Sequence, residues 1–166
     1  MQAQQLHDHI IKPALEYMGG NYNTPEARLL LLATAAIESD CGYYIKQVNG
    51  PALGIWQMES DTHDDTLTNC DAIRDSGFSN KIYDLTPILP IKTHPLIGSS
   101  MYACAMARLK YSMDRQALPK ITGDRKIDEV EFYKYYKRVY NTNLGASTFE
   151  KWQVKCEKHN IFEVKL

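Results

Sequence analysis

A segment that is apolar on almost every side sets the strongest limit on how this chain can fold. It runs from Glu26 to Ile37 and has no polar face after Arg28. Thr24 is a good N-cap for it, and Pro25 fits the first helical position. A helix without a polar face lies in the centre of a domain, because every side of it must be removed from water. The sequence therefore predicts a buried central helix with the rest of the chain packed around it.

Further helical signals predict what surrounds this central helix. They predict helices over residues 2–18, 60–67, 95–113, 128–140 and 147–158. Turn pairs and aromatic residues predict a small irregular or β lobe over residues 43–58, and prolines predict irregular structure over 74–95. A length of 166 residues suits one domain. We therefore expect a single, mainly α domain over residues 1–166.

Individual residues mark where these helices begin or bend. Pro13 lies inside the first helix and is expected to kink or split it. Ser60 is expected to cap the helix that follows the lobe. Asp128 and Ser147, each followed three residues later by a glutamate, form capping-box patterns that predict the starts of the last two helices.

Charge and hydropathy argue against two classes of partner. The net charge of −1 gives no general attraction to nucleic acid. Residues 1–83 carry 5 basic and 11 acidic side chains, whereas residues 84–166 carry 14 basic and 9 acidic ones. Either opposite halves of one domain face each other, which we favour, or a basic face meets an anionic polymer such as a bacterial wall. The longest nearly apolar stretch, 29–37, is too short to span a bilayer, so no membrane insertion is expected.

A tyrosine-rich run over residues 133–140 interleaves rings with cations. Stacking combined with charge is how single-stranded nucleic acid is bound. On a helix, however, Phe132, Tyr135, Tyr136 and Val139 share one apolar face. We therefore interpret the run as an amphipathic helix and expect no nucleic-acid partner.

The cysteines are too widely spaced for a zinc or redox pattern. They are Cys41, Cys70, Cys104 and Cys156. We expect reduced thiols that are mostly buried as small apolar groups. The sequence predicts no metal site and no other cofactor.

Glu38 is the residue that carries most information about chemistry. It follows the apolar segment directly, so it stands at the end of a buried helix. Partial burial and the negative end of the helix dipole both raise the pKa of a carboxyl group. A carboxyl group that stays protonated near neutral pH is what a general acid requires. The alternative is a helix-end glutamate whose side chain points into water.

Three segments around Glu38 resemble the motifs of a known enzyme family. Residues 36–39 read Ala-Ile-Glu-Ser, and residues 54–57 read Gly-Ile-Trp-Gln after a loop. Residues 139–145, Val-Tyr-Asn-Thr-Asn-Leu-Gly, are similar to a stretched form of a late Ala-Tyr-Asn-x-Gly motif. In order and spacing these segments resemble the lytic transglycosylases of the lysozyme superfamily. The resemblance spans residues 26 to about 146 and implies a lysozyme-like α+β fold.

The resemblance implies a reaction and a set of roles. Glu38 would be the catalytic acid and base that cleaves the β-1,4 bond between N-acetylmuramic acid and N-acetylglucosamine in peptidoglycan, leaving 1,6-anhydromuramic ends. Ser39, Gln57 and Asn141 would bind substrate or orient other groups. Tyr140 would hydrogen-bond Glu38 and hold its orientation. Taken singly, these residues are equally compatible with ordinary roles, such as Ser39 as a helix C-cap.

Two further features leave alternatives open. Trp56 is either a platform for sugar stacking or a core residue. A hydrolytic muramidase usually has a second carboxylate that directs water. The candidates are Asp40, Glu59 and Asp61, of which Asp61 is far enough along the chain to return across a cleft, as in goose-type lysozymes. Asp61 also fits an ordinary helix start, and for all three residues we favour an ordinary role over a catalytic one.

Competing functions are a peptidase, an amidase and a module without catalysis. A cysteine peptidase would use Cys41 with His63 or His94, but Cys41 follows a helix end, whereas a thiolate gains from a helix N-terminus. A zinc amidase would need ligands at suitable spacing, and the only close pair is in the segment 7–9. The serious alternative is a lysozyme-like module that binds wall glycan or forms a structural part of a virion.

The biological setting follows from the same resemblance. The first residues lack the basic start and apolar run of a signal peptide, so a start in the cytoplasm is expected. A short wall-degrading domain of this kind is similar to bacteriophage proteins. It would be an endolysin released to the wall from the host cytoplasm, or a virion component in contact with other virion proteins.

Overall fold

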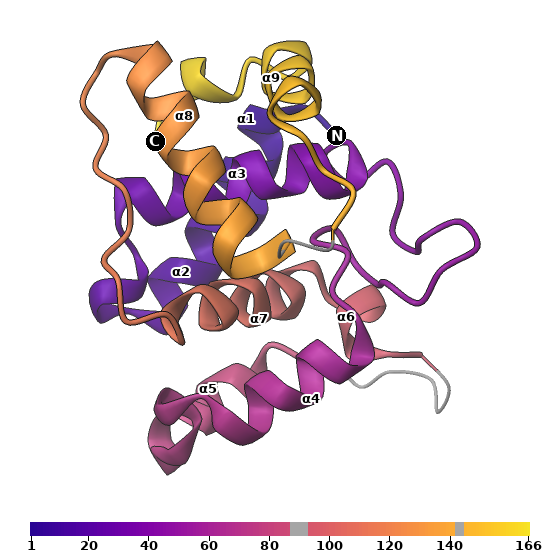
Figure 1. The fold of residues 1–166 in the computed structure, drawn as a ribbon. Helices are drawn as coiled ribbons and strands as arrows, with labels where there is room; N and C mark the ends of the chain where they lie inside the picture. Colours follow the sequence, from indigo (N-terminus) through magenta and orange to yellow (C-terminus); the bar gives the residue numbers. More distant parts are fainter. Residues whose placement is uncertain (87–92, 142–144) are drawn as a thin grey trace.

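The computed structural model describes residues 1–86, 93–141 and 145–166, and helices make up nearly all of its regular structure (Figure 1). In chain order the elements are α1 (Ala3–Leu6), η1 (His7–Ile11), α2 (Lys12–Met18), η2 (Gly20–Tyr22), α3 (Pro25–Ser39), α4 (Ser60–Asn69), η3 (Asp71–Arg74), α5 (Ser76–Asp84), α6 (Pro95–Gly98), α7 (Ser100–Ser112), α8 (Arg125–Tyr136), η4 (Lys137–Asn141), α9 (Phe149–Lys158) and η5 (Ile161–Glu163). The segments η1 and η4 are π-helical, and η2, η3 and η5 are 3₁₀-helical. The prediction of a mainly α fold is confirmed.

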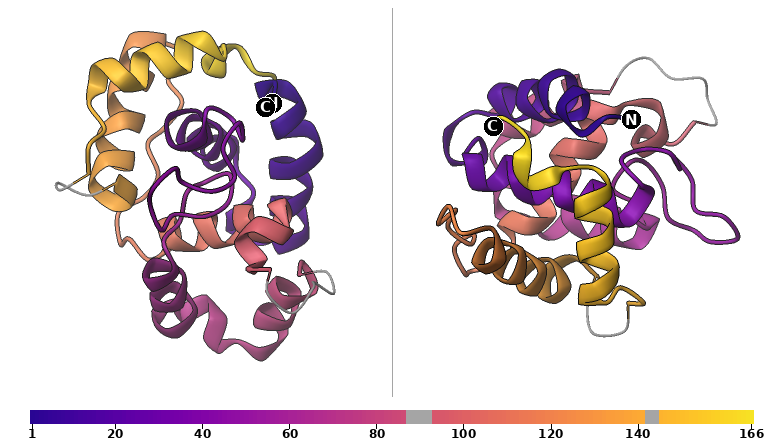
Figure 2. Two further views of the ribbon diagram at one scale, coloured as in Figure 1. Left: turned by 90° about the vertical axis from the view of Figure 1, so that its right-hand side faces the viewer. Right: turned by 90° about the horizontal axis from the view of Figure 1, so that it is seen from above.

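Helix α3 is the buried centre that the sequence predicts. Viewed along its axis it is surrounded by the other helices (Figure 2, left), and it packs against η1, α7, α8 and α9. The side chain of Thr24 caps its first turn by accepting a hydrogen bond from the Ala27 amide at 3.2 Å. The buried hydroxyl of Thr34 donates to the Leu30 carbonyl and bonds Tyr111 Oη, each at 2.7 Å. The one polar side chain in the middle of the helix is therefore satisfied, as burial demands.

Contrary to the prediction, Pro13 does not break the first helix. The chain stays helical from Ala3 to Met18 through η1, the π-helical stretch that directly precedes α2. Pro13 lies in the first turn of α2, where its missing N–H costs little. The wider π turn before it makes room for the proline ring, which would clash with a regular α turn.

Residues 74–95, predicted to be irregular, contain helix α5. Asp75 caps this helix by accepting from the Phe78 amide at 2.8 Å, and Ile82 is fully buried. The ring of Phe78 stacks on Tyr22 at 4.9 Å. A cap and tertiary packing of the apolar residues outweigh the turn formers of this segment. The part of the prediction that concerns residues 87–92 lies outside the described residues.

The helix starts differ from prediction by a few residues. Glu59, not Ser60, occupies the N-cap position of α4, without a side-chain cap bond. Asp124, not Asp128, caps α8. The Asp128 carboxylate accepts hydrogen bonds from Thr122 and Gly123 in the preceding loop. These loop bonds compete with capping for the same carboxylate.

Two further helix boundaries differ as well. Thr148 caps α9 in place of Ser147, accepting from the Lys151 amide at 3.3 Å. The helix predicted over 95–113 is divided at Ser99, whose hydroxyl caps α7 by accepting from the Tyr102 amide at 3.1 Å. The serine hydroxyl thus offers the backbone an alternative to a continuous helix.

Of the two alternatives predicted for the lobe after α3, the structure shows the irregular one, and the described residues contain no strand. Only two isolated bridges form, between Lys46 and Leu53 and between Leu53 and Met58. The first part of the lobe projects from the body of the molecule (Figure 1). Its end is buried in the core through Ile55, Trp56 and Met58. The lobe is therefore anchored by side chains rather than by a sheet.

All four cysteines are free and buried, as the sequence predicts. Across residues 1–86, 93–141 and 145–166, no helix has the length and apolar character needed to cross a membrane.

Candidate active site

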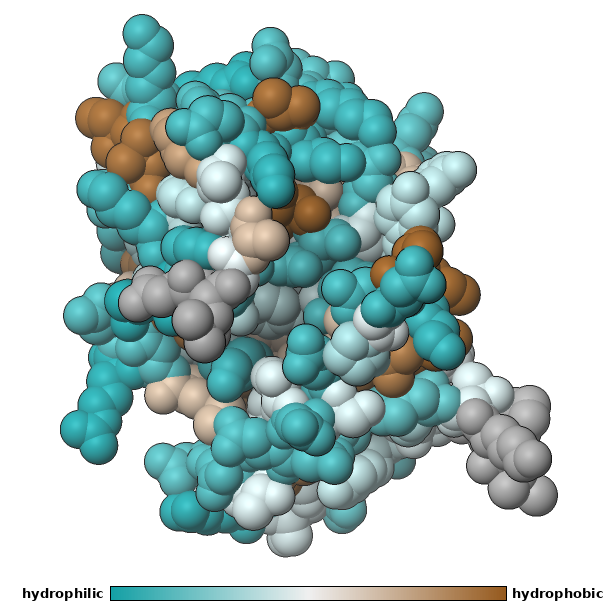
Figure 3. All heavy atoms as spheres, turned by 45° about the vertical axis from the view of Figure 1, so that its right-hand side comes forward, coloured by the Kyte–Doolittle hydropathy of each residue, from teal (hydrophilic) through white to brown (hydrophobic). Residues whose placement is uncertain are grey.

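A cleft of about 520 Å³ opens beside the C-terminal end of α3. Its lining comes from α3, the lobe, the start of α4, helix α7, the end of α8, η4, the segment after residue 144 and α9. Figure 3 shows the surface hollowed near its centre, where hydrophilic and pale side chains predominate. A volume of this size suits a small ligand or a few sugar units of a polymer.

Glu38 lines this cleft from the last turn of α3. Tyr136 Oη of α8 donates a hydrogen bond to Glu38 Oε1 at 2.6 Å. Burial raises the pKa of Glu38, and this effect outweighs Tyr136, Asn141 and Lys137, each of which lowers it. The carboxyl group is thus shifted toward its protonated form while one of its oxygens stays fixed, as a general acid requires.

Asn141 is oriented toward Glu38 by a small hydrogen-bond network. Its Oδ1 accepts from Lys137 Nζ and from Ser147 Oγ, each at 2.7 Å. Because both donors point at Oδ1, that atom is the amide oxygen, and Nδ2 is left to donate. This agrees with the lowering of the Glu38 pKa by Asn141. A Cβ built on Gly145 would collide with Asn141 Oδ1, so this glycine leaves room for the network.

The partner predicted for the Tyr140 hydroxyl is wrong. Tyr140 lines the cleft, yet its hydroxyl donates to the Trp56 carbonyl at 2.9 Å, and it is Tyr136 that bonds Glu38. Residues four apart lie on one face of a helix, so both rings point the same way, and the earlier one reaches α3. The two rings stack with centroids 6.4 Å apart. The tyrosine-rich run was the signal for this face of the helix, although it does not distinguish Tyr136 from Tyr140.

Ser39 and Trp56 do not face the cleft. This corrects the substrate-binding role that the resemblance implied for Ser39, and of the two alternatives for Trp56 it leaves the core residue. Ser39 is fully buried, and its hydroxyl donates to the Ala35 carbonyl and accepts from the Gly42 amide, which closes the end of α3. Trp56 is 1% exposed, and its Nε1 donates to the Leu31 carbonyl at 2.9 Å. A ring buried in this way offers no face to a sugar. Both residues build the support under Glu38.

Gln57 lines the cleft from a tight turn. Its backbone has φ of 46°, and its Nε2 donates to the Gly54 carbonyl at 2.7 Å. Gly54 has φ of 74°, and a Cβ there would collide with the Leu96 carbonyl oxygen. Only glycine fits this close approach, which accounts for the glycine of the Gly-Ile-Trp-Gln segment.

The candidate second carboxylates occupy three different environments. Asp61 is exposed in the first turn of α4 and does not line the cleft. Glu59 does line it, at the N-cap of the same helix. Of the three, Glu59 is therefore the one that shares the cleft with Glu38, and the placement of Asp61 across the cleft is not observed.

The Asp40 carboxylate is bound by three side chains of the C-terminal segment and therefore has a structural role. Lys155 Nζ, Lys158 Nζ and His159 Nε2 contact its carboxylate at 2.8, 2.5 and 2.8 Å. Although partial burial opposes them, these contacts hold the pKa of Asp40 well below its usual range. Its backbone is left-handed, with φ of 56°. Asp40 thus fastens the end of α3 to α9.

The thiol and metal alternatives find little support in the described residues. Cys41 is fully buried, and burial raises its pKa to about 11, so it is a poor nucleophile. His63 bonds Asp64 and the Tyr102 hydroxyl instead. Within the described parts of the chain, no group of three or more His, Cys, Asp or Glu side chains could hold a metal ion.

Comparison with known proteins assigns no family to this chain. No family model, no curated protein and no solved structure matches it. Within the cleft, Tyr136 and Asn141 are joined to Glu38 by hydrogen bonds, and these three residues form its centre.

Proposed function

We propose that the protein cleaves the β-1,4 bond between N-acetylmuramic acid and N-acetylglucosamine in bacterial peptidoglycan, as a lytic transglycosylase with a lysozyme-like fold. The observation that carries the proposal is the largely buried Glu38 carboxyl group, whose pKa is raised, at the wall of a polar cleft. The order of the Glu-Ser, Gly-Ile-Trp-Gln and Tyr-Asn segments along the chain supports it.

In the proposed reaction Glu38 acts first as an acid. Tyr136 occupies Oε1, so the proton is expected on Oε2, from which it passes to the glycosidic oxygen as the bond to C1 of muramic acid breaks. Positive charge develops at C1, and the neighbouring N-acetyl group can stabilise it. The new Glu38 carboxylate is then stabilised by Tyr136, Asn141 and Lys137, each of which favours its charged form.

Glu38 acts next as a base. It takes the proton of the C6 hydroxyl of the same muramic acid, and that oxygen bonds to C1 to close a 1,6-anhydro ring. An intramolecular hydroxyl has a large effective concentration compared with water. Gln57 and Asn141 are the polar side chains that we expect to position the sugars.

A hydrolytic muramidase is the second candidate, and one observation favours it. Glu59 lines the same cleft as Glu38. If Glu59 directs a water molecule to C1, the product is a reducing muramic end instead of an anhydro ring. In that case Glu59→Gln would abolish cleavage, whereas the transglycosylase reaction needs no second carboxylate.

A module that binds wall glycan or other virion proteins without cleaving is the remaining alternative. The experiment that separates it is the loss of turbidity of purified peptidoglycan, measured with the wild type, Glu38→Gln and Glu59→Gln. We expect clearing by the wild type and by Glu59→Gln but none by Glu38→Gln with an unchanged circular dichroism spectrum. Clearing by Glu38→Gln would refute the proposal, and a wild type that binds without clearing would favour the module.

The proposed setting is that of a bacteriophage protein. It would act either from the host cytoplasm, after release to the wall, or as part of a virion. Peptidoglycan glycan strands are the proposed partner in both cases, and no cofactor is required by the reaction described above.

A further inference from the structure

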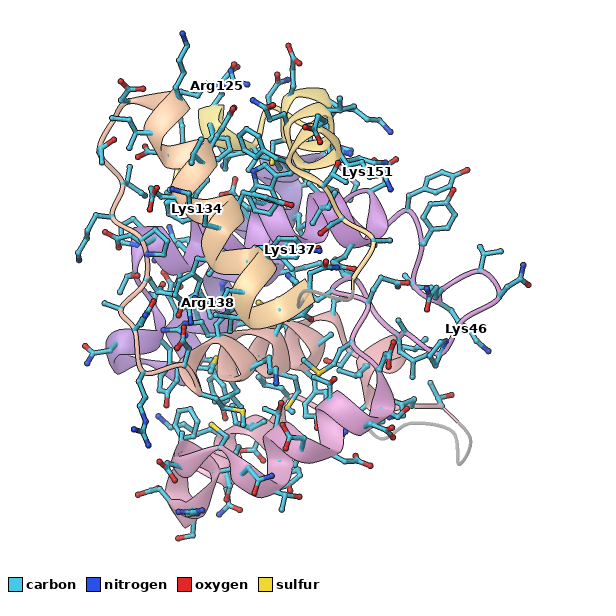
Figure 4. All side chains as sticks on the ribbon, in the orientation of Figure 1. Lys46, Arg125, Lys134, Lys137, Arg138 and Lys151 are labelled. Atoms are coloured by element: carbon cyan, nitrogen blue, oxygen red, sulfur yellow. The ribbon has the colours of Figure 1, made fainter. Side chains whose placement is uncertain are left out.

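Lys151, a cation that lines the cleft, differs from cations of the neighbouring helix α8 because it has no carboxylate partner among the described residues. Along α8, Lys134 and Arg125 pair with Glu131 and Glu129 (Figure 4). Lys151 of α9 lines the cleft, and among the described residues no carboxylate lies within ion-pairing distance of it. A cation at the rim of the cleft is therefore left without an acidic partner from this part of the chain.

The ammonium group of Lys151 has N–H groups that make no hydrogen bond to the described residues. Its Nζ donates to the Ala146 carbonyl at 3.1 Å, which uses one of the three N–H groups of an ammonium. Lys137, by contrast, donates to both Asn141 and Gly145 within the network beside Glu38. Lys110 also lines the cleft, and its Nζ lies 3.8 Å from Asp65 Oδ2. Of these lysines Lys151 is the exposed one, and its side chain is the one most available to a ligand.

We propose that Lys151 recognises a carboxylate of the peptide stem carried by muramic acid, so that the cleft prefers glycan whose stems carry free carboxylates. The inference rests on the proposed function. The two sugars of the glycan are neutral where the lactyl group is joined to a peptide, and neutral side chains such as Gln57 suit their hydroxyl and acetamido groups. The negative charge of the polymer lies in its stems, and an unpaired ammonium at the rim complements it.

The test compares the wild type with Lys151→Gln on two substrates. One is peptidoglycan freed of teichoic acids, and the other is the same material after its stem carboxylates have been converted to amides. An exposed ion pair is worth about 0.2–1 kcal/mol, so KM for the substrate with free stem carboxylates should rise about 1.5- to 5-fold in Lys151→Gln, with kcat unchanged. Cleavage of the amidated substrate should be the same for both proteins, and the difference between them on the first substrate should shrink as salt is raised.

Lys134→Gln is the matched control. Lys134 is also exposed and basic, but it is paired with Glu131 and does not line the cleft, so this variant should behave as the wild type on both substrates. Equal losses of Lys151→Gln on both substrates, or no loss on either, would overturn the inference and leave the proposed function standing. Peptidoglycan that retains its teichoic acids serves as a third substrate, and a loss of Lys151→Gln seen only on it would assign the site to phosphate and also overturn the inference. If the wild type cleaves neither substrate, the proposed function itself is wrong.

Discussion

Replacing Tyr136 with phenylalanine tests how the cleft controls its acid. The change removes the hydroxyl that donates to Glu38 Oε1 at 2.6 Å and leaves the ring, which packs on Tyr140 and Trp152. A hydrogen bond to a charged group contributes about 1.5–3 kcal/mol, and about 1.4 kcal/mol corresponds to one pKa unit. Since this bond favours the charged form, its loss should raise the pKa of Glu38 by about 1–2 units.

The assay is the pH dependence of kcat/KM for peptidoglycan cleavage, whose alkaline limb reports the acid of the free enzyme. Because Glu38 must be protonated to act, the limb of Tyr136→Phe should move to higher pH by about 1–2 units, while the maximal rate falls through loss of the orienting bond. Tyr140→Phe is the matched control. Its hydroxyl donates to the Trp56 carbonyl, so its loss should lower the free energy of unfolding by about 0.5–1.5 kcal/mol without moving the limb.

Two results would contradict this reasoning. An alkaline limb that stays in place in Tyr136→Phe would mean that the hydrogen bond does not act on the catalytic group. A shift of equal size in both variants would mean that general loosening of the cleft, rather than the bond to Glu38, sets the pKa.

Three further predictions concern stability and the thiols. Glu38→Gln should raise the free energy of unfolding at neutral pH, because burial disfavours the charged form of Glu38 and raises its pKa. This added stability should disappear as the pH falls through the raised pKa to 4.5, the ordinary value, because the carboxyl group is then protonated in both states. A difference in thermal unfolding that does not change with pH would contradict this prediction. Asp40→Asn should lower the free energy of unfolding by about 1–3 kcal/mol at neutral pH. Because the pKa of Asp40 is depressed, this difference should shrink as the pH falls below 3.8, which chemical denaturation can follow. Iodoacetamide should leave the native protein active and unlabelled at Cys41, which is fully buried with a pKa of about 11, and inactivation in step with labelling would favour a peptidase.

The centre of the fold could be predicted because its signal is local and unambiguous. The segment after Arg28 is apolar on all sides, and Thr24 and Pro25 mark its start, so burial and helical structure follow from the sequence alone. Helix α5 could not be predicted in the same way. It depends on Asp75 as a cap and on contacts of Phe78 and Ile82 with distant residues, and tertiary packing of this kind overrides the turn propensity of the segment.

The candidate site was predicted in part for a related reason. Glu38 follows the predicted helix directly, so its position could be derived. Which tyrosine reaches it depends on how α8 and η4 are rotated against α3, and no local pattern distinguishes Tyr136 from Tyr140. In the same way, whether Trp56 faces a sugar or the core is decided by the Leu31 carbonyl, which lies far from it in sequence.

The most direct test of the central claim is the mass spectrum of the products released from peptidoglycan by the wild type and by Glu38→Gln. Carrying out the digestion in ¹⁸O-labelled water separates the two proposed reactions, because hydrolysis adds a water oxygen at C1 and ring closure does not. We expect the wild type to release muropeptides with unlabelled 1,6-anhydromuramic ends, which lack one water, and Glu38→Gln to release none. Labelled reducing ends would establish hydrolysis in place of transglycosylation, and release by Glu38→Gln equal to that by the wild type would contradict the account at its centre.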